Sequence, residues 1–478
     1  MNAKRLNRRD FLKTTGTVTG ASLLAACVAP AAPAPAGEQA AAEEPMAEEG
    51  SVAMWSMSFP PHEWMMGAAI EVFQEAGERG FTLDYQPQPG QYSAKLRAAM
   101  SADEAPDIFV MHGTALLELA LAGHIAPVTP DIVTLEQAKR EFMPETYLQS
   151  LYDGNLYAIG VPDPPGDAGL VANLDHLEEA GLEHLTVFEN IDQMLDYAEQ
   201  LVIREGDDIL RAGLMFTGDG NNPIYWLSAI IDLGGTWFDN DNQVFTLQTA
   251  ESTAAMQFFY DVVWEKRLDD PALGNNSSDA LAQGLASLAF KWPEFVPYSG
   301  TAFPGLRLGF IVKPGFTEGK PAIFNHSDTW NLAVWSGTEN KDSVTEFLSY
   351  CAQREVQRAM LEQNPGISPL KEINFNDDFF VTGKGAYLAP VLDAITKGQY
   401  RYYGPFGNMD TLEYDIMWPV MNRMLQQELT VEETLVEMEN ALNDEMAQYQ
   451  DKYPGLDPVQ IQWDGLPAEL MEGIPMQG

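Results

Sequence analysis

Strand and helix patterns alternate along the chain between residues 51 and 123. The predicted strands are residues 51–58, 81–90 and 105–113, and the predicted helices cover residues 62–80, 91–103 and 115–123. Ile108 to Met111 are all apolar, which is typical of a strand buried on both faces. Trp64, Ala68 and Val72 repeat at helical spacing. The order β-α-β-α-β-α predicts an α/β fold with a parallel, doubly wound sheet.

Two groups of residues follow the first and third predicted strands. In an open α/β sheet, ligands bind outside the carboxyl ends of the strands. Position therefore indicates ligand contact for six residues: Ser56, Met57, Ser58, His112, Gly113 and Thr114. Tyr92, at the start of the second helix, is a further candidate, whereas we expect Asp107 to fix the start of the third strand.

The N-terminus has the pattern of an export signal. A basic head precedes an apolar run that is too short to span a bilayer. Arg8-Arg9-Asp10-Phe11-Leu12-Lys13 resembles a twin-arginine signal, and Leu24-Ala25-Ala26-Cys27 resembles a bacterial lipobox, in which Cys27 is lipidated. Residues 28–50 are rich in Ala, Pro and Glu and contain no aromatic residue, which predicts a disordered tether. We therefore predict a signal over residues 1–27 and a lipid-anchored protein at the outer face of the cytoplasmic membrane.

Charge and composition exclude several classes of function. The chain has 27 basic and 70 acidic residues, for a formal net charge of −43. Nucleic acid is excluded as a partner because its binding depends on Lys and Arg, and no basic cluster indicates a pocket for an anionic ligand. Cys351 is the only cysteine besides Cys27, so we expect a buried thiol and no internal disulfide. No two of the 6 histidines are spaced as i and i+4, so we expect neither a metal site nor a cofactor, although Ca²⁺ binding by carboxylates stays open.

Short motifs follow one another in the order of a known family. They are VAMWSMS, YQPQPGQYSAKLRAAMSADEAPDIFVMHG, DGNLYAIGVPD, LDHLEEAGL, LGGTWFD, LASLAFKWPEF and NLAVWSGTENKDSVTEFLSYCAQREVQRAM. Each motif is weak alone, but their order over most of the chain is specific. The chain resembles the extracellular solute-binding proteins of family 1, the sugar-capturing lipoproteins of bacterial ABC importers, which include the maltose-binding protein.

The resemblance implies two α/β lobes that close on a ligand in the cleft between them. Lobe one would comprise residues 51–160 and 322–364, lobe two residues 161–321 and 365–460, and a C-terminal tail residues 461–478. The protein would be a monomer that captures a neutral carbohydrate and delivers it to ABC permease subunits. The scarcity of basic residues argues against sugar phosphates.

A neutral sugar needs flat aromatic surfaces for its CH faces and polar groups for its hydroxyls. The resemblance implies a ligand-stacking role for Trp292, which follows the predicted strand 286–290. The other aromatic candidates are Trp226, Trp330, Tyr402, Tyr403, Tyr414 and Trp418. The polar candidates are Asp163, at the crossover between the lobes, and Asp219, in a polar loop.

Two alternative functions stay open on the sequence. An exported glycoside hydrolase would need two carboxylates about 5–10 Å apart, and Glu294 would be its first candidate. A surface adhesin or sensor subunit could use the same fold. No G-x-S-x-G elbow, P-loop or Cys/His arrangement indicates another class of enzyme. We therefore predict a binding protein that is not an enzyme.

Overall fold

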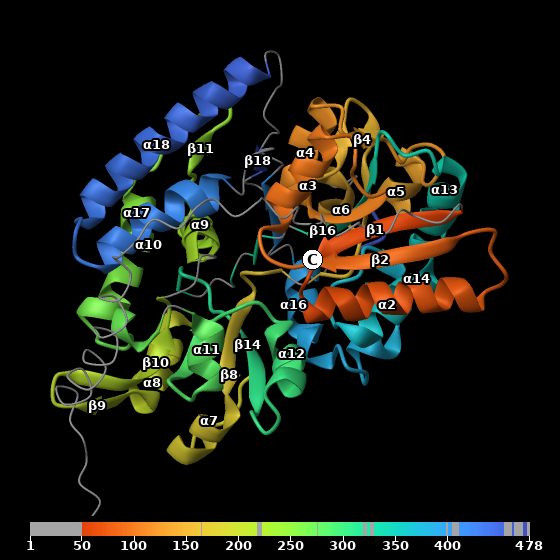
Figure 1. Cartoon of the computed structure of the whole chain (residues 1–478). Helices are drawn as coiled ribbons and strands as arrows, with labels where there is room; N and C mark the ends of the chain where they lie inside the picture. Colours follow the sequence, from red (N-terminus) through yellow and green to blue (C-terminus); the bar gives the residue numbers. More distant parts are fainter. Residues whose placement is uncertain are drawn as a thin grey trace, which may run out of the picture. The chain divides into compact units, whose positions relative to one another are not determined.

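The computed structural model describes residues 50–478, except 164, 218–221, 275, 319–321, 323, 326–328, 398–399, 404–410, 454–460, 463–471 and 476–478. The export signal, Cys27 and nearly all of the tether therefore lie outside the described residues. Two sheets, each covered by helices, organise the described part of the chain (Figure 1). We call the six-stranded sheet with its helices lobe one, and the five-stranded sheet with its helices lobe two.

Lobe one has the strand order β2-β1-β3-β16-β4, with β7 also paired to β16. Its strands are β1 (Ser51–Met57), β2 (Thr82–Gln88), β3 (Ile108–His112), β4 (Ile125–Ala126), β7 (Ala158–Gly160) and β16 (Trp330–Trp335). β1 pairs in parallel with β2 and β3, which confirms the predicted parallel unit. β16 is antiparallel to β3, so the sheet is mixed rather than wholly parallel.

The helices of lobe one explain how this sheet is buried. They are α2 (Pro60–Glu75), α3 (Tyr92–Ser101), α4 (Gly113–Leu121), α5 (Leu135–Glu141), α6 (Pro144–Leu148), α13 (Lys341–Cys351) and α14 (Arg354–Gln363). α2 lies beside β1 and β2 (Figure 1) and buries Met65, Met66 and Phe73. The Asp107 carboxylate accepts the Ala53 N–H at 2.8 Å, so Asp107 has the structural role that we predicted.

The sequence pattern predicts a single helix from residue 340 to 362, but the structure contains two, α13 and α14. The chain breaks at Gln353, whose φ of −85° and ψ of 152° are extended. The break turns α14 along α2, where Val356 and Met360 are buried. Cys351, at the end of α13, is buried and free, as predicted.

Lobe two has the strand order β14-β8-β13-β10-β9. Its strands are β8 (Gly169–Asn173), β9 (Ile203–Glu205), β10 (Asp208–Met215), β13 (Ala286–Phe290) and β14 (Leu308–Val312). Its helices are α7 (Leu174–Ala180), α8 (Ile191–Leu201), α9 (Asn222–Asp232), α10 (Ala250–Trp264), α11 (Ser277–Ala282), α12 (Phe295–Ala302), the π-helical turn η4 (Thr411–Met417), α17 (Trp418–Leu425) and α18 (Val431–Lys452). Because α9, α10, α17 and α18 share one apolar core with this sheet, the C-terminal helices belong to lobe two.

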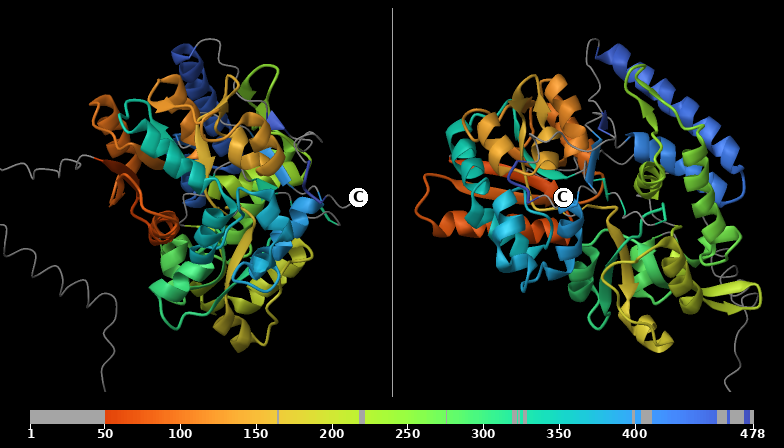
Figure 2. Two further views of the ribbon diagram at one scale, coloured as in Figure 1. Left: turned by 90° about the vertical axis from the view of Figure 1, so that its right-hand side faces the viewer. Right: turned by 180° about the vertical axis from the view of Figure 1, so that it is seen from behind.

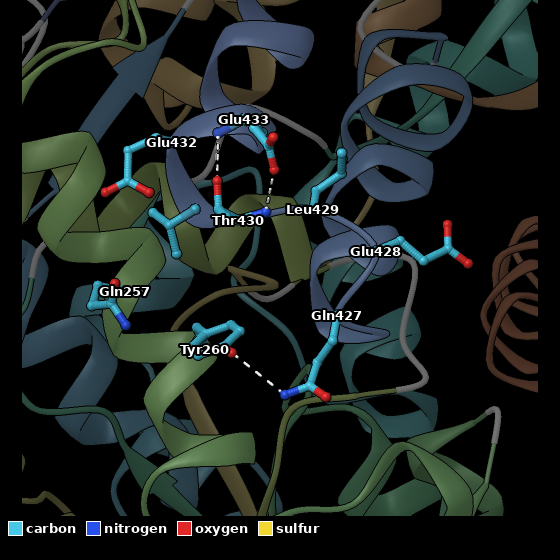
Figure 3. A pocket seen from close by; sticks show the side chains of 9 residues that line it. Gln257, Tyr260, Gln427, Glu428, Leu429, Thr430, Glu432 and Glu433 are labelled. Carbon is cyan, nitrogen blue, oxygen red and sulfur yellow. Dashed lines mark hydrogen bonds between the residues drawn. The ribbon is translucent and has the colours of Figure 1, made fainter.

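The long helix α18 is well defined by its ends and its packing. The Glu433 N–H donates to Thr430 Oγ1 at 3.1 Å and the Thr430 N–H donates to Glu433 Oε2 at 2.9 Å, which forms a capping box (Figure 3). α18 then runs along the hairpin of β11 (Phe238–Asp239) and β12 (Val244–Phe245) (Figure 2). Such a start satisfies amide groups that a helix N-terminus otherwise leaves unpaired.

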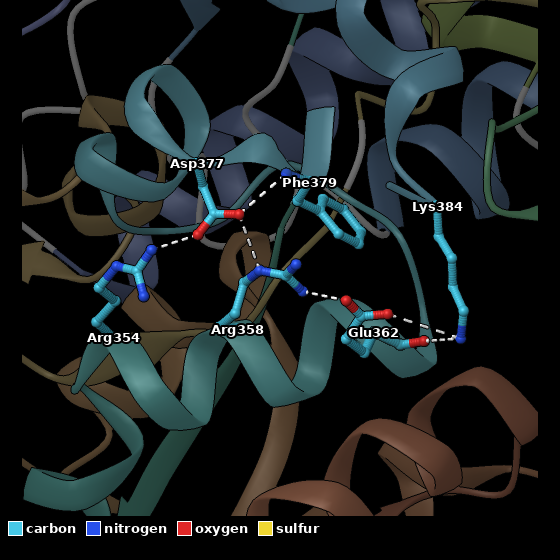
Figure 4. A network of polar contacts seen from close by, with 6 residues as sticks. All are labelled: Arg354, Arg358, Glu362, Asp377, Phe379 and Lys384. Carbon is cyan, nitrogen blue, oxygen red and sulfur yellow. Dashed lines mark hydrogen bonds and ion pairs between the residues drawn. The ribbon is translucent and has the colours of Figure 1, made fainter. Parts of the chain in front are cut away.

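Residues 371–396 follow α14, and ion pairs join the first of them to lobe one, although we predicted that lobe two resumes at residue 365. They form α15 (Lys371–Asn376), η2 (Asp378–Phe380), η3 (Ala386–Leu388) and α16 (Ala389–Thr396). Arg354 and Arg358 of α14 both bond the Asp377 carboxylate, and the Arg358 guanidinium lies 4.5 Å from the Phe379 ring centroid (Figure 4). These ion pairs join segments that no periodicity in the sequence connects.

Four passages of the chain connect elements of one lobe with elements of the other, and their described residues include 161–163, 165–168, 313–318, 324–325, 400–403 and 461–462. Three of these passages contribute a strand to one small sheet, in the order β15 (Phe324–Asn325), β17 (Tyr400–Tyr403) and β18 (Ile461–Gln462). An isolated bridge between Asp163 and Ile367 lies in the first passage. Among the described helices, none combines the length and apolar character needed to cross a bilayer.

Candidate ligand site between the lobes

A tryptophan contacted by two histidines forms the lobe-one side of the candidate site. Trp330, at the start of β16, pairs in register with His112, at the end of β3. The Trp330 ring centroid lies 3.7 Å from that of His112 and 4.3 Å from that of His62, near the start of α2. Burial, and to a smaller degree the nearby His112, lowers the pKa of His62 to about 3, so His62 is neutral at physiological pH. These contacts cover part of the Trp330 ring.

Three residues after β13 form the lobe-two side. Lys291 is only 2% exposed, and its Nζ lies 3.4 Å from the Trp292 ring centroid. This cation–π contact orients the indole. The Trp292 ring is partly exposed, while its Nε1 is buried without a hydrogen-bond partner among the described residues. Trp292 therefore offers both an apolar surface and one N–H donor.

Glu294 follows Trp292 by two residues in the chain and is 9% exposed. Burial raises the pKa of the Glu294 carboxyl to about 8, and the charges of Lys291 and His112 only partly oppose this rise. Its Oε2 has no hydrogen-bond partner among the described residues. Near neutral pH most of the carboxyl is protonated, so it can both donate to and accept from a hydroxyl group. Phe59 of lobe one and Tyr298 of lobe two, whose ring centroids lie 5.7 Å apart, bring side chains of both lobes together beside this site.

We expect Glu294→Gln to flatten the pH dependence of stability. Between about pH 4.3, where a free Glu titrates, and about pH 8, folded Glu294 holds a proton that the unfolded chain has lost. The free energy of unfolding should therefore fall as the pH rises through this window. Melting temperatures from pH 5 to 8.5 should decline more steeply for the native protein than for Glu294→Gln. Parallel profiles would contradict the raised pKa.

The structure brings some predicted residues into or near this site. His112, Trp292 and Trp330 form the cluster described above. Asp163 lies in the first passage between the lobes and is 8% exposed. Its backbone N–H donates to the Ile367 carbonyl at 3.0 Å. At the end of β1, Met57 is partly buried and Ser58 is exposed, with its hydroxyl donating to Glu63 Oε1 at 2.9 Å.

Four other residues that were predicted to contact a ligand are buried in the interior of the protein. Ser56 is buried with its hydroxyl 2.7 Å from that of Tyr85. The hydroxyl of buried Tyr92 donates to the Val110 carbonyl at 2.8 Å. Trp226 is 0% exposed and its Nε1 donates to the Ser252 carbonyl at 3.3 Å.

Gly113 is the fourth of these residues. A Cβ on Gly113 would lie 1.5 Å from Gln149 Oε1, so the glycine lets the Gln149 side chain approach. For Ser56, Tyr92, Gly113 and Trp226, the predicted ligand contact does not fit these positions. The physical reason is that polar character in a sequence does not reveal an internal hydrogen-bond partner.

The remaining candidates lie elsewhere or outside the described residues. Tyr414 is 41% exposed in the π-helical turn η4, and Trp418 packs against the core of lobe two one turn later. Single π-turns are frequent at functional sites. Asp219 lies outside the described residues, as do the side chains of Thr114, Tyr402 and Tyr403.

Sequence reasoning did not name His62 or Lys291 as site residues, and it considered Glu294 only as a carboxylate of the alternative hydrolase. Lys291 and Glu294 stand on either side of Trp292 in the stretch FKWPEF. Two charged residues directly after a strand predicted to be buried could have marked them as candidates for the site. His62 had no such signal, because its role comes from contact with Trp330.

A cavity of about 560 Å³ lies beside the cluster and is lined from both lobes. Its lining residues are Trp64, Val296, Pro297, Thr301, Gln363, Pro365, Lys384 and Tyr387. Tyr298 connects it to the cluster, with ring centroids 6.5 Å from Trp64 and 5.7 Å from Phe59. The smaller pocket at the start of α18 (Figure 3) has a volume of about 330 Å³ and lies within lobe two. Among the described residues, no group of three or more His, Cys, Asp or Glu side chains is arranged to hold a metal ion.

Comparison with known proteins agrees with this architecture. The family profile of the bacterial extracellular solute-binding proteins matches residues 61–358. The chain belongs to this family. No curated protein sequence matches the chain.

Among solved structures, similar ones include the GacH receptor of Streptomyces glaucescens GLA.O, studied unliganded and with acarbose. It has a TM-score of 0.68 and 20% identity over 84% of this chain and 98% of that one. An ABC substrate-binding protein from Listeria monocytogenes in complex with cycloalternan has a TM-score of 0.69 and 16% identity over 84% and 100%. Maltose-bound MalE3 of T. maritima has a TM-score of 0.66 and 16% identity over 82% and 98%. At these identities the likeness establishes the two-lobed fold of this family member.

Proposed function

We propose that this protein is the substrate-binding subunit of an ABC importer and captures a neutral carbohydrate outside the cell. The observation that carries the proposal is that Trp292 and Glu294, in the segment directly before the cavity residues Val296 and Pro297, each keep a buried polar atom without a hydrogen-bond partner among the described residues. The indole offers a flat surface and an unpartnered N–H, and the neighbouring carboxyl offers a donor and an acceptor. A sugar needs this combination. Several similar structures hold oligosaccharides, among them cycloalternan and maltotetraose.

Capture would proceed by closure of the lobes on the sugar. His112 and Trp330 come from lobe one, and Lys291, Trp292 and Glu294 come from lobe two. A ligand that touches both groups binds the closed form better than the open form, and this difference in affinity is what shifts the equilibrium. The closed, loaded form would then deliver its sugar to membrane permease subunits.

The proposal includes the route to the membrane. The twin-arginine signal over residues 1–27 would direct export, and lipid on Cys27 would hold the protein at the outer face of the cytoplasmic membrane. Residues 28–50 would act as the tether of a monomeric binding domain. The extracellular character of the family supports this location.

A thermal-shift screen tests the proposed ligand class. The panel would contain maltose, maltotriose, maltotetraose, acarbose, cycloalternan and α-D-tagatose, with amino acids and polyols as other classes. A ligand at about 100 times its Kd should stabilise the folded protein by about 2.7 kcal/mol. We expect a clear rise in melting temperature with one class of carbohydrate and no product on chromatography. Turnover would favour the hydrolase, and a response to amino acids alone would contradict the proposal.

A further inference from the structure

The cavity of about 560 Å³ adjoins the segment that carries Trp292. Tyr387, which lines the cavity, donates its hydroxyl to the carbonyl of Pro293 at 3.4 Å, and Pro293 directly follows Trp292 in the chain. Two further lining residues, Val296 and Pro297, come from the same segment at the start of α12. The cavity and the Trp292 indole therefore belong to neighbouring parts of one site.

A series of ring contacts also leads from the cavity to the lobe-one cluster. The ring centroid of Trp64, on the cavity wall, lies 6.5 Å from that of Tyr298, and Tyr298 lies 5.7 Å from Phe59. The Phe59 ring lies 5.2 Å from His62, which in turn contacts Trp330. Trp64 is therefore part of an aromatic surface that the cavity and the cluster share.

Most of the cavity wall is apolar. Its apolar part is formed by Trp64, Val296, Pro297, Pro365 and the ring of Tyr387. The Tyr387 hydroxyl is 3.4 Å from the carbonyl oxygens of both Pro293 and Pro365, to which it donates. This polar atom is thus already bonded within the protein, and the cavity meets mainly the ring of Tyr387.

The other polar side chains of the lining are exposed to solvent. They are Thr301, Gln363 and Lys384. The Lys384 Nζ donates to the Glu362 carbonyl at 2.7 Å and lies 3.8 Å from Glu362 Oε2 (Figure 4). A sugar ring inside the cavity would lose water from its hydroxyl groups and find few partners for them, which is costly.

The position at Trp292 has the opposite character. Trp292 Nε1 and Glu294 Oε2 are buried polar atoms without a hydrogen-bond partner among the described residues. Such atoms suit the hydroxyl groups of a sugar, whereas an apolar wall suits a group that makes no hydrogen bonds. The two neighbouring parts of the site therefore fit the two ends of an amphipathic ligand.

We propose that the cavity is the subsite for an aromatic group carried by the carbohydrate, so that the ligands of this protein are aryl glycosides. The inference rests on the proposed carbohydrate function. A cavity of about 150 Å³ is enough for a benzene ring, so the volume of about 560 Å³ accommodates a phenyl or naphthyl group. Trp64 would pack against the ring of that group.

Calorimetry with matched glycosides tests the proposal. The probes are the methyl and 4-nitrophenyl glycosides of glucose, galactose, xylose and maltose, together with maltotriose. An aryl group buries apolar surface that a methyl group lacks, so the aryl glycoside of the sugar that binds should bind at least tenfold tighter, or about 1.4 kcal/mol. Equal affinities would overturn the aryl subsite and leave the carbohydrate function standing. Tighter binding of maltotriose than of 4-nitrophenyl maltoside would assign the cavity to a further sugar unit.

Two substitutions locate the effect in the cavity. In Trp64→Ala, and separately in Thr301→Trp, which places a large side chain at the cavity, the ratio of aryl to methyl affinity should fall to near one. Trp335→Ala is the matched control, because Trp335 is another partly exposed tryptophan of lobe one and does not line the cavity. A ratio that stays at ten or more in both folded cavity variants would contradict the assignment.

A free aromatic probe separates this inference from the proposed function. The fluorine NMR signal of 4-fluorophenol should broaden with the native full chain and should broaden less with Trp64→Ala and Thr301→Trp. If no carbohydrate and no glycoside binds, the proposed function fails, while broadening that depends on Trp64 still supports an aromatic site in the cavity. Native protein that neither broadens this signal nor prefers an aryl glycoside would overturn the inference.

Discussion

Asp167→Ala is expected to lower the free energy of unfolding by about 3–5 kcal/mol, the cost of breaking a buried ion pair. Asp167 precedes β8 and Lys313 follows β14; both side chains are fully buried, with Asp167 Oδ2 3.2 Å from Lys313 Nζ. The Ser228 hydroxyl also donates to this carboxylate. Removing the carboxylate takes the Asp167 charge away from the buried Lys313 ammonium, and the low effective dielectric makes the loss of this interaction expensive.

Urea denaturation of three variants measures this effect. Asp175→Ala is the matched control, because Asp175 pairs with Arg307 at 2.7 Å but both side chains are about half exposed. An exposed pair contributes about 0–1 kcal/mol. Asp167→Ala combined with Lys313→Met should recover much of the loss, because no unbalanced charge stays buried. Equal losses for Asp167→Ala and Asp175→Ala would show that burial does not strengthen the pair.

Trp292→Ala is expected to weaken carbohydrate binding at least tenfold, or about 1.4 kcal/mol. The variant removes the flat surface of the indole and its Nε1–H together. It also leaves the Lys291 ammonium without the ring that lies 3.4 Å from its Nζ. Titration calorimetry with the carbohydrate that gives the largest thermal shift measures the change.

Two further variants separate the contributions at this position. Trp292→Phe keeps an aromatic surface but lacks the N–H donor, so its affinity should lie between those of the native protein and Trp292→Ala. Trp335→Ala is the control, because Trp335 pairs with Ile125 at the end of β16 remote from His112. Native affinity in a folded Trp292→Ala would remove Trp292 from the site.

The two predictions concern neighbouring parts of lobe two. Lys291 follows β13 and Lys313 follows β14, and their backbone N–H groups donate to Gly169 and Ala168. Two buried lysines thus flank one passage between the lobes in a strongly acidic chain. No basic cluster was visible in the sequence, because more than twenty residues separate the two lysines.

The apolar periodicity of the sequence was sufficient to predict several strands and helices. The strands β1, β2 and β3, with α2, α3 and α4, were predicted from apolar periodicity, since each helix or strand buries a face that its own residues define. The order of short motifs led to the solute-binding family, which the family profile confirms. The same reasoning placed Trp292 directly after a buried strand.

Contacts between residues far apart in the sequence decided features of packing and burial that the apolar periodicity could not predict. The segment at Asp377 is joined to lobe one because Arg354 and Arg358 of α14 pair with its carboxylate. Trp226 and Tyr92 were predicted from the sequence to contact the ligand. Both are buried, and their polar atoms donate to backbone carbonyls.

By itself, the sequence determined the class of fold, the family and the position of Trp292, because these follow from periodicity and from the order of neighbouring residues. Only the tertiary structure decided which polar groups face the boundary of the lobes. His62, His112, Lys291 and Glu294 come from three separate parts of the chain. Their burial, and with it the raised pKa of Glu294, exists only once those parts have packed together.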